Sequence, residues 1–207
     1  MASFDRGRSA ATAVAALGAA APSVVFAHAP VEGVEGFYVG IVHPLSTPDQ
    51  LLALLGLGVM LGLRWPAGFG RIWAVFLLAM LAGVAWGQLS GLPLWASTAL
   101  LLVAIVTTTL AALLPAGIQA ASLALAGLVG GLIGVLSTPE PGPLPATIFT
   151  IAGSVVGANL ALFYVSAGIG ALRRKFDQPW FLIGVRVLAA WIGAVSIILI
   201  ALATAQA

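Results

Sequence analysis

The sequence predicts an all-α, polytopic membrane helix bundle, and two observations carry that prediction. Of its 207 residues, 61% are hydrophobic and only 7% are charged, whereas about 25% of the residues in a soluble domain are charged. Apolar stretches near the roughly 20 residues that cross a bilayer recur along the chain, separated by proline and glycine. This composition excludes a nucleic-acid binder and a disordered chain, and it makes the lipid bilayer the expected partner.

The first 27 residues are typical of a secretory signal peptide. Arg6 and Arg8 precede the apolar run Ala10–Ala21, and Val25-Phe26-Ala27 fits a small-x-small cleavage site. The alternative is an uncleaved N-terminal helix, which would give seven helices in all. We therefore expect residues 1–27 to be a leader or a first helix, and residues 28–207 to form a single membrane-embedded domain.

Six further apolar segments predict six spans, each bounded by turn-forming residues. They are Pro48–Leu63, Arg71–Gln88, Pro93–Leu114, Gln119–Leu136, Pro145–Leu172 and Pro179–Thr204.

Charge asymmetry predicts the orientation of the bundle. Arg64 and Arg71 flank the first loop, and Arg173–Lys175 lie in the fifth, whereas the loops at Leu89–Leu92 and Ser137–Pro143 contain no Lys or Arg. The positive-inside rule makes the arginine loops cytoplasmic. We expect a multi-pass protein of a bacterial inner membrane whose mature termini are both periplasmic.

Small-xxx-small pairs predict close helix packing, because glycine lets helix backbones approach in lipid. Such pairs could also serve a membrane-protein partner or a second copy of the chain. They are Gly58/Gly62, Gly83/Gly87, Gly127/Gly131, Gly130/Gly134 and Gly153/Gly157.

A short broken helix is predicted before the first span. Apolar residues from Val34 to Ile41 follow a helical period, and Pro44 disfavours the α conformation at His43, so the helix should stop there. Thr47 and Gln50 are spaced as a capping box that starts the next helix. The break should form a polar pocket near the outer surface.

His28, His43 and Asp49 are the candidate metal ligands. His28 and His43 are the two histidines of the sequence. Two imidazoles with a carboxylate suit nickel, cobalt, copper or zinc. We expect His43 and Asp49 to approach each other across the break, with His28 folding onto the same place. The alternatives are that Asp49 complements the helix dipole and that His43 caps a helix end or sits among lipid headgroups.

The same segment resembles the HupE/UreJ family. The residues that carry the resemblance are Gly36–Leu45 (GFYVGIVHPL), Asp49–Ala53 (DQLLA) and the late run Arg186–Ala194 (RVLAAWIGA). The family motif has the form H-P-[LF]-x-G-x-D-H-[IL]-L. The resemblance implies a signal peptide, about six spans and a hydrogenase- or urease-linked permease for nickel or cobalt.

The chain departs from the family pattern where histidines are concerned. Thr47 replaces the motif's glycine and Gln50 its final histidine, and Ala126–Gly131 lacks both histidines of a family motif in a middle span. Two interpretations follow: a divergent metal-binding or metal-transporting protein, or a non-transporting accessory subunit packed against a larger membrane complex. No nucleophile with a base, phosphate loop or haem pair of histidines is evident, so we expect no catalysis.

Overall fold

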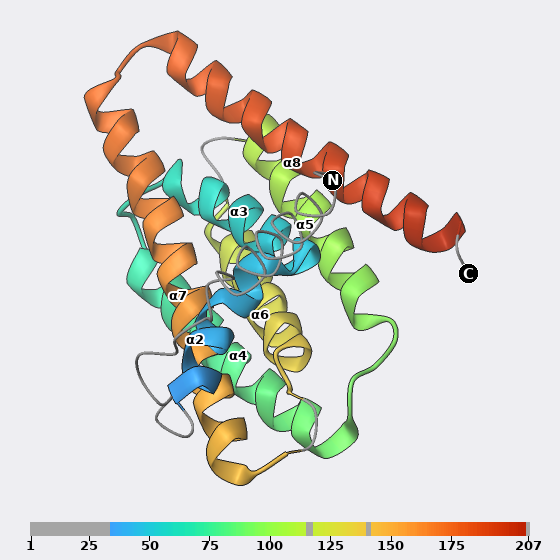
Figure 1. Cartoon of the computed structure of the whole chain (residues 1–207). Helices are drawn as coiled ribbons and strands as arrows, with labels where there is room; N and C mark the ends of the chain where they lie inside the picture. The colour runs from blue at the N-terminus through green and yellow to red at the C-terminus, as the bar shows by residue number, and fades with distance from the viewer. Residues whose placement is uncertain (1–33, 115–117, 140–141, 206–207) are drawn as a thin grey trace, which may run out of the picture. The chain divides into compact units, whose positions relative to one another are not determined.

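The computed structural model describes residues 34–114, 118–139 and 142–205, all of which fall in one compact unit, Glu32–Ala207. Within these residues the regular structure is entirely α-helical, as predicted. The predicted leader, residues 1–27, lies outside the described residues. The helices are α2 Val34–Ser46, α3 Pro48–Gly62, α4 Phe69–Ser90, α5 Ala96–Leu113, α6 Gln119–Leu136, α7 Leu144–Lys175 and α8 Pro179–Ala205 (Figure 1).

Five of these helices, α4 to α8, are long and apolar enough to cross a membrane, and α2 with α3 supplies a sixth span if the bent pair is counted as one. The two helices meet at an angle of 71°. The sequence assigned a full span to Pro48–Leu63, but α3 alone has 15 residues and reaches only about 22 Å of the roughly 30 Å required. The chain is a multi-pass membrane protein, and its bent helix pair α2–α3 is the candidate for a broken first span.

The break falls one turn later than the sequence indicates. Pro44 lies inside α2 and does not end it, because proline only biases the preceding residue away from the helix. The carbonyl oxygen of His43 accepts the backbone N–H and hydroxyl of Thr47, at 3.1 and 2.8 Å, and the hydroxyl of Ser46, at 3.1 Å. These bonds continue the helix to Ser46, and the change of direction follows at Thr47.

Helix α3 lies at the centre of the bundle. Eleven of its fifteen residues are buried, and it contacts α2, α5, α6, α7 and α8. Figure 1 shows it surrounded by these helices. The largest fully buried side chains include Leu54 and Leu57 of α3 together with Phe76 and Met80 of α4. The element that follows the break is therefore the core helix of the fold.

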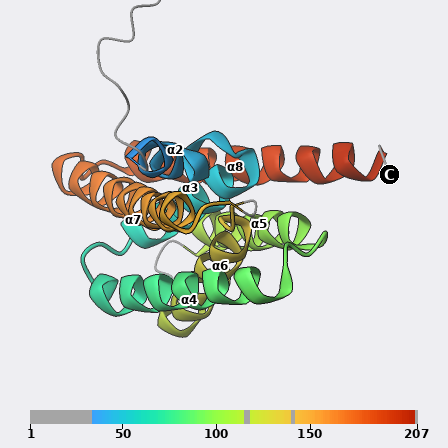
Figure 2. The ribbon, with the colours of Figure 1, turned by 60° about the horizontal axis from the view of Figure 1, so that its bottom comes forward.

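Two helix pairs, α4 with α6 and α2 with α7, pack through their glycines, and Figure 2 separates the two pairs. A Cβ atom on Gly83 would meet the backbone of Gly131, and one on Gly153 would meet the carbonyl oxygen of Phe37. Of the predicted pairs, Gly83/Gly87, Gly130/Gly134 and Gly153/Gly157 lie at these crossings, and Gly58/Gly62 packs against α7. The pair Gly127/Gly131 is different, since Cβ atoms there would make only ordinary contacts.

Basic side chains mark one end of the bundle, which we call the cationic end: Arg64, Arg71, Arg173–Lys175 and, in the first turns of α8, Arg186. Three arginines there contact helix termini. Arg173 donates to the carbonyl oxygen of Leu63 after α3, and Arg186 donates from Nε to that of Ala112 in the last turn of α5. Arg64 donates to Oε1 of Gln119 at the start of α6, at 3.2 Å.

Candidate metal centre at the broken span

The register between α2 and α7 sets the depth of the break. The backbone of Ile41 packs on Gly157 in the middle part of α7, and His43 and Ser46 follow within about one further turn. Helix α7 is the longest helix in the described residues and runs parallel to α2. The position of the break along the bundle can therefore be given by the α7 residues beside it. The break lies nearer the middle of α7 than the N-terminal end of that helix, whereas the sequence placed it near one end of the bundle.

The His43 imidazole faces the side chain of Gln50 across the break. Its Nε2 atom lies 3.4 Å from Nε2 of Gln50, and His43 is half-buried. An amide N–H can donate to this ring nitrogen when the imidazole proton is on Nδ1. Rotation of the amide would present its oxygen to a protonated ring nitrogen instead. The pair can therefore adapt to either tautomer of His43.

Gln50 is almost fully buried, with 1% of its surface exposed. Its Oε1 is buried and has no hydrogen-bond partner. The predicted capping box is wrong: Thr47 makes no side-chain cap, because its hydroxyl bonds back to His43, and the amide of Gln50 turns to the same histidine. Sequence reasoning assigned Gln50 a purely local role, and it missed this contact because Thr-x-x-Gln spacing fits a cap equally well.

Asp49 is the second residue of α3 and is also buried, at 8% exposure. Its Oδ1 accepts the backbone N–H of Gln50 at 2.8 Å. A carboxylate in the first turn is stabilised by the free N–H groups and the positive end of the helix dipole. That placement explains how a carboxylate is accommodated at this buried position.

Two of the predicted ligands, His43 and Asp49, therefore each contact Gln50, and no direct hydrogen bond joins them. His43 contacts the side-chain amide and Asp49 the backbone amide of this residue. His28 lies outside the described residues. Within the part of the chain that the structure describes, no group of three or more His, Cys, Asp or Glu side chains could hold a metal ion.

Further unpaired polar atoms lie on α7. Most buried hydroxyl groups in the bundle donate to a carbonyl one turn earlier, as Ser196 does to Ile192 at 2.9 Å. The hydroxyls of Ser154 and Ser166, two fully buried residues, have no hydrogen-bond partner. Oδ1 of Asn159 has none either. The amide nitrogen of Asn159 donates to the carbonyl of Val155 at 2.8 Å and lies 3.9 Å from Sδ of Met80 on α4.

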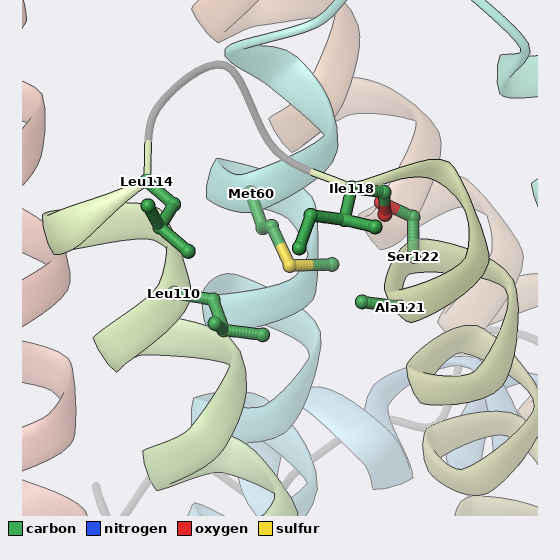
Figure 3. Close-up of a pocket in the computed structure, with 6 residues that line it drawn as sticks. All are labelled: Met60, Leu110, Leu114, Ile118, Ala121 and Ser122. Carbon is green, nitrogen blue, oxygen red and sulfur yellow. The ribbon is translucent and has the colours of Figure 1, made fainter.

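A small hollow between α3, α5 and α6 is lined almost wholly by apolar side chains (Figure 3). Met60 points into it from α3, between Leu110 of α5 and Ala121 of α6. Ser122 is its one polar side chain, and the hydroxyl of Ser122 donates to the carbonyl of Ile118 at 3.2 Å. This hollow therefore offers an ion no nitrogen or carboxylate ligand, unlike the break, and the thioether of Met60 is its one soft donor.

The comparisons with known proteins agree with this architecture. No curated protein and no solved structure matches the chain. A family model described as HupE / UreJ protein matches residues 14–201, which include every described helix except the last turn of α8. The match extends far beyond the short motif around His43, and the chain belongs to the HupE/UreJ family.

Proposed function

We propose that this protein captures a divalent transition-metal ion at the broken first span and passes it through the bundle. Nickel or cobalt is the expected substrate, with copper or zinc as alternatives, because nitrogen and oxygen donors bind all four. Family membership supports this proposal, since the resemblance to HupE/UreJ proteins implies nickel or cobalt permeation. The proposed orientation places the cationic end in the cytoplasm and the outer ends of α2 and α7 toward the periplasm of the inner membrane.

One observation carries the proposal: an oxygen with no partner is buried beside an imidazole at a helix break. A buried amide oxygen that makes no hydrogen bond destabilises the fold by about 1–3 kcal/mol. Oε1 of Gln50 is in this situation next to His43. Broken helices with free polar groups are where membrane transporters bind ions. A cation bound there would be coordinated by the oxygen that the protein itself leaves unpaired.

The ligands then take distinct roles. His43 supplies a ring nitrogen, and Asp49 supplies the negative charge that offsets a divalent cation. Gln50 supplies a neutral oxygen. His28 is proposed to complete the set from the N-terminal segment, with its free amine as a further donor if the leader is removed after Ala27. Because the metal competes with a proton for the imidazole, binding should weaken on acidification.

The direct test is metal titration of the purified protein. We expect His43→Ala to weaken Ni²⁺ or Co²⁺ binding by about 100-fold, because loss of a group that only supports a ligand already costs about 10–100-fold. Asp49→Asn should weaken it by about tenfold, since a neutral amide replaces the carboxylate.

Asp177→Asn is the matched control, because Asp177 is an exposed carboxylate at the cationic end. It should bind metal like the wild type. Undiminished binding by the His43→Ala variant would remove His43 from the site.

A second function remains in view because fewer than three acidic or nitrogen ligands cluster in the described residues. In it, the protein is an accessory subunit whose exposed apolar helices contact a larger membrane complex. Metal accumulation in cells with and without the gene separates the two. Uptake that depends on the gene, by a protein that purifies alone in mild detergent, would exclude the accessory role.

A further inference from the structure

The crossing of α4 with α6 and the crossing of α2 with α7 have the same pattern of glycine contacts. In the first, Cβ atoms on Gly130 and Gly134 of α6 would meet the carbonyl oxygens of Phe76 and Met80 of α4. In the second, Cβ atoms on Gly36 and Gly40 of α2 would meet those of Ala146 and Thr150 of α7. In both, the glycines of one helix lie over carbonyls of the other that are four residues apart.

The reciprocal contacts repeat as well. Cβ atoms on Gly83 and Gly87 of α4 would meet the carbonyl oxygens of Gly131 and Val135. Cβ atoms on Gly153 and Gly157 of α7 would meet those of Phe37 and Ile41. A single shift of 70 residues relates every α4 position to its α7 counterpart, and one of 94 relates every α6 position to its α2 counterpart.

The sequences of the paired segments agree with this register. Leu81–Gly87 reads LAGVAWG against IAGSVVG in Ile151–Gly157, and Gly130–Leu136 reads GGLIGVL against GFYVGIV in Gly36–Val42. The number of turns between the glycines is the same in each case. Glycine pairs are common in membrane helices, but chance does not readily give eight contacts in one constant register.

The two pairs run in opposite directions. Helices α4 and α6 both begin at the cationic end, where Arg64 contacts Gln119. Helices α2 and α7 both run toward that end, where Arg173 contacts Leu63. Inverted repeats of this kind are the usual framework of secondary transporters, in which one half moves against the other.

Contacts within a pair and between pairs differ in kind. Within each pair, most of the close contacts join backbone to backbone, and the nearest side-chain atoms are the hydroxyls of Thr150 at Gly36 and of Thr138 at Gly87. The two pairs contact each other directly through α4 and α7, where Asn159 faces Met80 with its Oδ1 unpaired. Helix α3, which has no counterpart in the repeat, packs between them and carries Asp49 and Gln50.

We propose that α4–α6 and α2–α7 are equivalent rigid pairs of an inverted repeat, and that the protein changes conformation by moving one pair against the other along the Asn159–Met80 contact. The bend at Ser46–Thr47 acts as the hinge between α2 and α3, and the contact of Gly58 and Gly62 with α7 is the packing that must shift when α7 moves with α2. This movement is independent of which ion is carried.

Spin-label distances in lipid nanodiscs test this proposal without a transport assay. The chain has no cysteine, so single cysteines can be introduced on faces that are more than half exposed: Leu78 of α4, Leu128 of α6, Tyr38 of α2 and Ile148 of α7. We expect one narrow distance distribution for Leu78→Cys with Leu128→Cys, and one for Tyr38→Cys with Ile148→Cys.

The pairing of Leu78→Cys with Ile148→Cys spans the two pairs. We expect two populations whose maxima differ by on the order of 5 Å, the scale of a one-turn helix shift. A distribution as narrow as those within the pairs would overturn the proposal, whether or not the protein binds metal. Loss of metal binding with two populations retained would instead contradict only the proposed function.

Engineered disulfides give a second test. Met80→Cys with Asn159→Cys joins the two pairs, and its oxidation should reduce the two populations to one, reversibly with reductant. Val75→Cys with Gly127→Cys is the matched control within one pair, since a Cβ on Gly127 lies 3.5 Å from Cγ1 of Val75. Its oxidation should leave both populations. Two populations that persist in the oxidised Met80–Asn159 variant would also overturn the proposal.

Discussion

The cationic end and the helix break both place polar side chains against helix termini, but they use them differently. At the cationic end, Arg173 and Arg186 each donate to a carbonyl near the end of a neighbouring helix. At the break, Gln50 is buried with its oxygen unpaired, and His43 lies 3.4 Å from its amide nitrogen. Arg173 and Arg186 satisfy backbone carbonyls, whereas the buried Gln50 leaves an acceptor oxygen unpaired beside an imidazole. An unpaired group at the cationic end, Nη1 of Arg64, is a cationic donor and cannot bind a metal ion.

This difference distinguishes polar side chains that stabilise the fold from polar side chains that can bind a ligand. An arginine that caps a helix contributes to stability through the carbonyl oxygen that it satisfies. A buried amide oxygen beside an imidazole lowers stability and can be compensated by a cation. Substitutions in the two regions should therefore affect different measurements, metal binding at the break and thermal unfolding at the cationic end.

Of the three substitutions that test this difference, Gln50→His should have the largest effect. A second imidazole beside His43 would add a nitrogen ligand, and Ni²⁺ binding should tighten by about tenfold, equivalent to about 1.4 kcal/mol. Metal titration measures this change. Gln119→His is the control at the cationic end. It should not tighten binding, because Gln119 lies beside Arg64 and not beside a metal ligand. Unchanged affinity in Gln50→His would mean that position 50 does not face the metal.

Arg173→Ala should lower the free energy of unfolding by about 1 kcal/mol, because the carbonyl of Leu63 loses its donor. Thermal unfolding in detergent detects this loss, and Arg173→Lys should recover part of it. Metal affinity of the folded variant should equal that of the wild type. A lower metal affinity with unchanged stability would place the cationic end on the path of the ion. It would contradict the distinction between the two regions.

Gln50→Leu should have the smallest effect on stability. Removing the unpaired oxygen favours the fold, while losing the contact with His43 opposes it, so we expect a net gain of about 0.5 kcal/mol. Metal binding should nevertheless weaken several-fold, because a ligand is lost. Thermal unfolding and titration on the same sample check the two signs. Lower stability would show that the contact with His43 outweighs the buried oxygen.

Much of the helical framework could be predicted from the sequence. The bounds of α6 agree with those predicted, and α3, α4 and α7 differ by only a few residues. Apolar length and proline or glycine breaks are local properties, so they locate a membrane helix without knowledge of its neighbours. The candidate ligands His43 and Asp49 were evident for the same reason, as rare polar groups beside a proline.

The partners of these residues were not predictable in that way. Nothing in the spacing Thr47-x-x-Gln50 tells whether the glutamine caps its own helix or reaches back to His43, since both are within reach of one side chain. The pair Gly36/Gly40 escaped notice for a related reason, because its importance depends on α7, more than 100 residues later.

Apolar composition and turn residues, by themselves, determined that this chain is a multi-pass helical membrane protein and where its helices run. Only the tertiary structure decided that the first span bends by 71° around a buried glutamine, and that two helix pairs repeat one crossing in opposite directions. The reason is physical. Helix formation in lipid follows from backbone hydrogen bonds within each segment, whereas which glycine meets which carbonyl depends on how distant segments approach.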